Sequence, residues 1–305
     1  MGEFDTVTVD DALKMMRTTS RLHDEVGQFL EQSGHRPRPG SQAATELSSF
    51  QRPGLVETAF SQGGILIEVA ADQLMAFVRT VTEPVQTIAP WTCVRALIES
   101  SALAVWILDP KVDAATRVRR SLAFRFEGLV QQRKIGRVSG DEAGTAKVAA
   151  RIDDLECAAA HLGFPRVENR SGKRIGVAQE MPSITNIVAG VLDEEVTYRL
   201  LSAVAHAHPW ALQQLSFRPA EDQHVLAAQL GAGAGTGQVM EKGLSPTAVA
   251  FLCRKAVPVF LRPLAHKCTL FGWDSEHLKR IVGPVLNGLG IGPQVPGPCE
   301  HRPNE

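Results

Sequence analysis

The segment 88–108, Ile-Ala-Pro-Trp-Thr-Cys-Val-Arg-Ala-Leu-Ile-Glu-Ser-Ser-Ala-Leu-Ala-Val-Trp-Ile-Leu, decides how this chain folds. Apolar residues occur on nearly every side of a helix drawn through it, which is typical of a helix buried at the centre of a bundle. Pro90 suits the first turn of that helix, and Asp109 with the proline after it ends the helix. We therefore expect a central helix over 88–108.

Two charged residues interrupt this apolar segment. Arg95 and Glu99 are four positions apart and can pair along one face of the helix. Because a charge inside the bilayer is expensive, a run broken in this way does not predict a membrane span. We expect no membrane association, and we expect the two charges to have partners inside the protein.

Helical spacing of apolar residues dominates the rest of the chain. It predicts helices over 9–33, 55–83, 112–135, 141–162, 182–191, 192–208, 245–271 and 275–288. A short strand is expected over 224–230, and 34–54 and 165–180 have the composition of polar loops. The chain is therefore predicted to be all-α, with a helical core, an N-terminal helical arm and a C-terminal helical extension.

The composition bounds the organisation and the environment. The predicted divisions are an N-terminal helix and linker (1–54), a core (55–217), a glycine-rich loop with C-terminal helices (218–290) and a mobile tail (291–305). The formal net charge is −1, so no overall field predicts a nucleic-acid or membrane binder. Five widely spaced cysteines without a CxxC pair indicate free thiols, and no signal peptide is evident, so we expect a cytoplasmic protein.

The sharpest chemical signal lies in the segment 192–210. Glu195, Arg199, Ser202 and His206 follow one another at steps of four, three and four, which places them on one stripe of a helix. A histidine can transfer protons near neutral pH, and an arginine binds phosphate through a fork of donors. The pair suits metal-independent cleavage of RNA by attack of the 2′-hydroxyl. The alternative is an Arg199–Glu195 ion pair with His206 capping the helix end.

The spacing of Arg199 and His206 resembles the R-x4–6-H motif of the HEPN superfamily. A second likeness, to uncharacterised bacterial HEPN-like proteins, is a Tyr-x-x-Leu-Ser-x-x-x-His segment that follows an Arg-x-x-x-Glu helix; its residues here are Tyr198, Leu201, Ser202, His206, Arg95 and Glu99. The resemblance covers residues 60–217. It implies a helical bundle, often a homodimer, whose active members cut RNA. Leu200 occupies a position that is commonly polar in catalytic members.

Two functional hypotheses follow from these residues. The first is a metal-independent endoribonuclease of the toxin or defence type, and the second is a non-catalytic helical protein that binds RNA, a nucleotide or a protein partner. The predicted catalytic residues are Arg199 and His206, oriented by Glu99 or Glu195. The predicted binding residues are Arg95, Tyr198, Ser202, His208, Arg117 and Arg120.

Other candidate sites are weaker. The arginine-rich helix 112–134 and the loop residues Lys173 and Arg174 are candidates for contacts with a phosphate backbone. His206 and His208 are two positions apart and point in opposite directions on a continuous helix, so we expect no metal. The glycine-rich segment 231–237 lacks the register of a nucleotide-binding loop, so we expect no organic cofactor.

Overall fold

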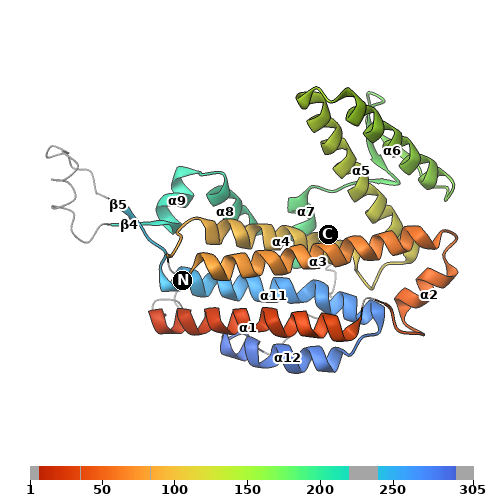
Figure 1. Ribbon diagram of the computed structural model, residues 1–305. Coiled ribbons are helices and arrows are strands. Elements are labelled where there is room, and N and C mark those ends of the chain that lie inside the picture. Colours follow the sequence, from red (N-terminus) through yellow and green to blue (C-terminus); the bar gives the residue numbers. More distant parts are fainter. Residues whose placement is uncertain (1–6, 35, 83, 220–239, 293–305) are drawn as a thin grey trace, which may run out of the picture.

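The computed structural model describes residues 7–34, 36–82, 84–219 and 240–292. Its main body is an elongated bundle in which long helices run side by side (Figure 1). The bundle helices are α1 (Val9–Ser33), α3 (Pro53–Thr80), α4 (Ala89–Ile107), α11 (Pro246–Phe271) and α12 (Ser275–Gly288). The prediction of a predominantly helical protein is confirmed for the described residues.

Helix α4 is the central element of this bundle. It packs against α3 and α11 on one side and against α7 (Ile184–Leu192) and α8 (Glu195–Ala205) on another. Trp91, Val94 and Leu97 are fully or almost fully buried, as are most other apolar residues of the helix. The apolar pattern of 88–108 therefore predicted both the helix and its central position.

The two terminal segments belong to the bundle rather than extending from it. Helix α1 packs against α11, α12 and α3, and its residues Leu22, Val26 and Phe29 are buried. Helix α11 packs against α4 and buries Phe260. The expected N-terminal arm and C-terminal extension were wrong, because the apolar faces of both segments complete the core.

The expected linker 34–54 contains a helix, α2 (Gln42–Ser49). Ser41 caps it by accepting a hydrogen bond from the amide of Ala44, and Glu46 on its inner face is buried. Helix α2 packs against α3 and α11. The strand expected over 224–230 and the glycine-rich segment 231–237 lie outside the described residues.

A helical hairpin projects from one end of the bundle (Figure 1). It consists of α5 (Ala114–Ser139) and α6 (Glu142–Ala160), as the sequence predicted. The segment expected as a polar loop instead forms an antiparallel sheet in the order β1-β2-β3, with strands β1 (Arg166–Glu168), β2 (Arg174–Val177) and β3 (Gln179–Glu180). The Asn169 side chain stabilises the β1–β2 turn by accepting hydrogen bonds from the amides of Ser171 and Lys173.

The predicted helix 192–208 is interrupted near its start. Asp193 adopts a left-handed conformation (φ 57°) and ends α7, and α8 begins two residues later. Helix α9 (Pro209–Leu215) follows, and then β4 (Phe217–Pro219) pairs with β5 (Met240–Lys242). Helices α8 and α9 lie at the end of the bundle opposite the α5–α6 hairpin (Figure 1). Across the described ranges, no helix combines the length and apolar character needed to cross a bilayer.

Candidate functional site

A polar network joins α4 to α8, and we call it the α4–α8 seam: Arg95, Glu99, Tyr198 and Ser202. The guanidinium of Arg95 forms an ion pair with Glu99 (Nη2–Oε1 2.7 Å) and donates through Nε to the Ser202 hydroxyl (3.0 Å). The Tyr198 hydroxyl donates to Oε1 of Glu99 (2.6 Å) and accepts from Arg95 Nη2 (3.3 Å). Four predicted site residues therefore come together.

The spacing of these residues explains the seam. Arg95 and Glu99 are one turn apart on α4, and Tyr198 and Ser202 are one turn apart on α8. Arg95 reaches Ser202 while Glu99 reaches Tyr198, so the two helices present matching polar faces in opposite chain directions. Burial first, and then the hydrogen bond to the Glu99 carboxylate, raise the pKa of Tyr198, which stays a neutral donor.

A second polar contact holds the beginning of α8 against α11. The ammonium of Lys255 donates to both carboxylate oxygens of Glu194, at 2.8 and 2.9 Å. The hydroxyl of Thr197 donates to the same carboxylate (2.6 Å). The sequence analysis did not identify Glu194 or Lys255 as partners, because the two are 61 positions apart.

Of the two carboxylates predicted to orient Arg199, Glu195 contacts it, and the prediction for Glu99 is wrong. Arg199 Nε pairs with Glu195 Oε1 at 2.7 Å, and its side chain is 66% exposed. Tyr198, one residue earlier, occupies the inward position, because a step of one residue turns a helix by about 100°. The alternative of an Arg199–Glu195 pair is confirmed, and Glu99 binds Arg95 and Tyr198 instead.

His206 and His208 lie on open surface where α8 passes into α9. His206 is the C-cap of α8, and its amide donates to the Ser202 carbonyl. Ala207 turns the chain with a positive φ of 54°, and the two imidazole rings then face each other edge to face, with centroids 6.5 Å apart. The helix break thus brings together two rings that a continuous helix would separate.

One large apolar residue is exposed on each of the two helices, Val196 near the start of α8 and Trp210 near the start of α9. The Val196 residue is 83% exposed and Trp210 is 50% exposed. We call Val196, Arg199, His206, His208 and Trp210 the α8–α9 surface. Within the described residues, no three histidine, cysteine or acidic side chains gather in a potential metal site.

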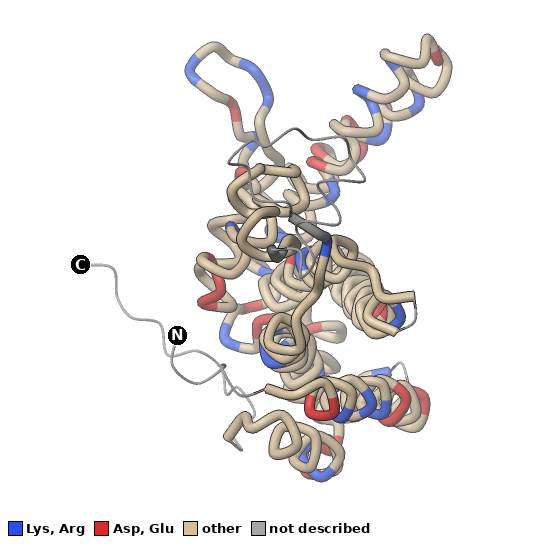
Figure 2. Tube along the Cα trace, turned by 90° about the vertical axis from the view of Figure 1, so that its left-hand side faces the viewer, with Lys and Arg blue, Asp and Glu red and all other residues tan. Residues whose placement is uncertain are grey.

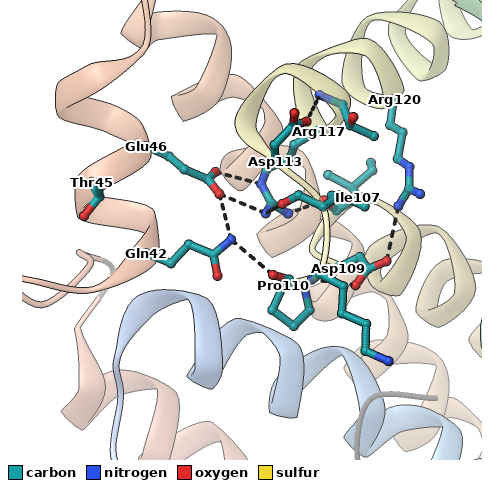
Figure 3. Close-up of polar contacts among 12 residues, drawn as sticks. Gln42, Thr45, Glu46, Ile107, Asp109, Pro110, Asp113, Arg117 and Arg120 are labelled. Atoms are coloured by element: carbon teal, nitrogen blue, oxygen red, sulfur yellow. Dashed lines mark hydrogen bonds and ion pairs between the residues drawn. The ribbon is translucent and has the colours of Figure 1, made fainter. Parts of the chain in front are cut away.

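Arg117 was predicted to contact RNA, and this was wrong. Its side chain is fully buried between α5 and α2 (Figure 3). It donates to both carboxylate oxygens of Glu46, at 2.9 and 3.2 Å, and to the carbonyls of Ile107 (2.7 Å) and Val112 (3.2 Å). Each of the three guanidinium nitrogens donates to the protein itself, so Arg117 connects α5 to α2 and to the end of α4.

Arg120 has a similar role and was also wrongly predicted as an RNA contact. It donates to the Trp106 carbonyl, lies over the Trp106 ring and pairs with Asp109 at 3.7 Å. The loop candidate Arg174 pairs with Glu156 (2.6 Å) and Asp153 (3.4 Å), whereas Lys173 is exposed. Lysines and arginines are interspersed with acidic residues along the chain (Figure 2). The arginine-rich composition of α5 therefore does not make a phosphate-binding face at Arg117 or Arg120.

Comparison with known proteins adds no relative. The chain matches no family model, no curated protein and no solved structure. The class of protein is therefore stated from the structure alone: a predominantly helical bundle with a half-buried polar seam and an adjoining exposed surface that carries an arginine, two histidines and a tryptophan.

Proposed function

We propose that this protein is a non-catalytic, HEPN-like helical protein that binds single-stranded RNA on its α8–α9 surface. The observation that carries the proposal is the half-exposed ring of Trp210, which follows the exposed His206 and His208 by a few residues. Aromatic rings stack on unpaired bases, and arginine contacts phosphates or stacks as well. Arg199, which reaches solvent at 66% exposure, provides that cation.

The α4–α8 seam has a positioning role in this proposal. Its hydrogen bonds join Arg95, Glu99, Tyr198 and Ser202 to one another, and Lys255 anchors Glu194 one turn away. These contacts fix the backbone of α8, which reduces the ordering cost of presenting its exposed side chains to RNA. The seam residues support the surface rather than contacting RNA themselves.

Cleavage of RNA is the second candidate function, and the paired histidines favour it. Rings 6.5 Å apart suit a general base and a general acid on either side of one phosphate. One imidazole takes the proton of the 2′-hydroxyl as that oxygen attacks phosphorus, and the other gives a proton to the departing 5′-oxygen. Arg199 first leaves its ion pair with Glu195 and then stabilises the charged intermediate. In the homodimer that the resemblance implies, two such surfaces could face one RNA.

Fluorescence anisotropy with a labelled single-stranded RNA tests the binding proposal. Replacement of a stacked aromatic ring weakens binding by about 1–3 kcal/mol, or roughly 5- to 150-fold, so we expect such a loss for Trp210→Ala. Arg199→Gln should also weaken binding and reduce its salt dependence. The matched control is Arg137→Gln, which removes an exposed arginine from α5 and should have no effect. Equal affinity in all four proteins contradicts the proposal.

Incubation of the same RNA with and without EDTA separates binding from cleavage. RNA that stays intact while it binds supports the non-catalytic protein. If the RNA is cut, His206→Ala and His208→Ala should each abolish cutting, and EDTA should have no effect. Cutting that survives in both variants rules out the acid–base pair. Light scattering at micromolar concentration checks the homodimer, which a monomeric mass contradicts.

A further inference from the structure

A groove on the opposite side of α4 from the α8–α9 surface contains a largely buried lysine, and no acidic side chain in the described residues forms an ion pair with it. The groove has a volume of about 800 Å³ and lies between α2, α3 and the end of α11. Leu47, Phe60, Ile65 and Phe271 form its apolar walls. This volume is within the range of small-molecule sites, about 300–1,000 Å³.

Lys267, a residue of α11, lines this groove and is only 9% exposed. Its ammonium lies over two aromatic rings, 5.0 Å from the Trp273 centroid and 5.5 Å from the Phe271 centroid. No side chain in the described ranges hydrogen-bonds or ion-pairs with it. Burial lowers the pKa of Lys267, and the charge of Glu68 opposes this effect from beyond ion-pair distance.

The two aromatic faces compensate the charge of this ammonium only in part, because a cation removed from water is normally paired with an anion or hydrogen-bonded to several acceptors. Arg117, which is also a buried cation in the described part of the chain, has an acceptor at each of its three guanidinium nitrogens. Unlike Arg117, Lys267 therefore has a charged group that can still bind an anion as its partner.

The backbone of α3 leaves space beside this ammonium at Gly64. Gly64 on α3 lines the groove, and a Cβ placed on it would meet Lys267 Nζ at 3.5 Å. Nζ is therefore at the groove wall beside a position without a side chain. Ile65, the next residue, is 55% exposed and widens the apolar surface at the opening.

We propose that this groove binds a small-molecule carboxylate with an apolar body, whose head group pairs with Lys267. A single ammonium matches a monoanion, and the nearby Glu57 and Glu68 disfavour a doubly charged phosphate. Arg36 at the rim offsets part of that negative charge. The apolar body lies against Phe60 and Phe271, and it covers the exposed part of Ile65.

Calorimetric titration of the full-length chain with octanoate, octanol and octylamine tests the proposal. These probes share one apolar chain and differ in the charge of the head group. We expect octanoate to bind at least about tenfold more tightly than octanol, because a charge-assisted hydrogen bond contributes a factor of this size, and we expect no binding of octylamine. Equal binding of the three probes overturns the assignment, and so does a response to inorganic phosphate without one to octanoate.

Two variants locate the binding. Lys267→Met keeps the length of the side chain and removes its charge, so it should bind octanoate no better than octanol. Gly64→Leu fills the groove beside Nζ and should abolish binding of both, while its helix propensity favours folding. Lys279→Met, which removes an exposed lysine of α12, is the control and should bind as the unmodified chain does. Unchanged octanoate binding in Lys267→Met overturns the proposal.

Discussion

Replacement of Arg117 by methionine should destabilise the fold without affecting RNA binding. The side chain is fully buried and makes four hydrogen bonds, two of them to Glu46. Its loss leaves the Glu46 carboxylate, whose side chain is 9% exposed, with Gln42 as its remaining partner (Figure 3). Breaking one side of a buried ion pair costs about 3–5 kcal/mol, and we expect a loss of that size in the free energy of unfolding.

A double-mutant cycle in urea measures this pair. Glu46→Leu should cost a similar amount, because it leaves a buried guanidinium with two carbonyl partners. The double variant should be no less stable than either single variant, since both buried charges are then absent. Arg137→Met, at an exposed position of the same helix, should change the stability by less than about 0.5 kcal/mol. A loss under 1 kcal/mol for Arg117→Met, together with weaker RNA binding, refutes the structural role.

Three further predictions concern other buried groups. Tyr198→Phe removes the hydroxyl that donates to Glu99 and should lower the free energy of unfolding in urea by about 1–2 kcal/mol; an unchanged value would show that the seam adds no stability. Burial raises the pKa of both Cys253 and Cys268 to about 12, so thiol labelling at pH 8 should modify the exposed Cys157 and spare these two cysteines until the protein unfolds. Equal labelling rates in the native protein would contradict this. Burial lowers the pKa of His266 to about 4, so between pH 6.5 and pH 4 the unfolded chain binds a proton that the folded chain does not, and the free energy of unfolding should fall by up to about 3 kcal/mol over that range. His266→Gln should reduce this loss, and a pH profile identical to that of the unmodified protein would count against it.

The helices were predictable where the apolar pattern is long. The segment 88–108 indicated a central helix from its own residues, and the structure buries Trp91 and Leu97 as expected. The segment 34–54 was misread because its Gly, Pro and Ser content is also typical of linkers. Only the packing of α2 on α3 and α11 shows why Glu46 is buried there.

The candidate site was predictable in part for a similar reason. The four-residue spacings of Arg95–Glu99 and Tyr198–Ser202 indicated two polar faces, and the structure joins them. The outward direction of Arg199 was one of two alternatives, because the spacing alone does not say which face of α8 packs on α4. The structural roles of Arg117 and Arg120 were not predictable, because their hydrogen-bond acceptors come from other segments of the chain, which local composition does not reveal.

Intrinsic tryptophan fluorescence during titration with single-stranded RNA tests the central claim most directly. All four tryptophans lie in the described part of the chain; Trp91, Trp106 and Trp273 are buried, and Trp210 is half exposed. If bases stack on Trp210, RNA should quench the emission of the unmodified protein, and Trp210→Phe should lose that response. Saturable binding without quenching, or the same quenching in Trp210→Phe, would contradict the proposed α8–α9 binding surface.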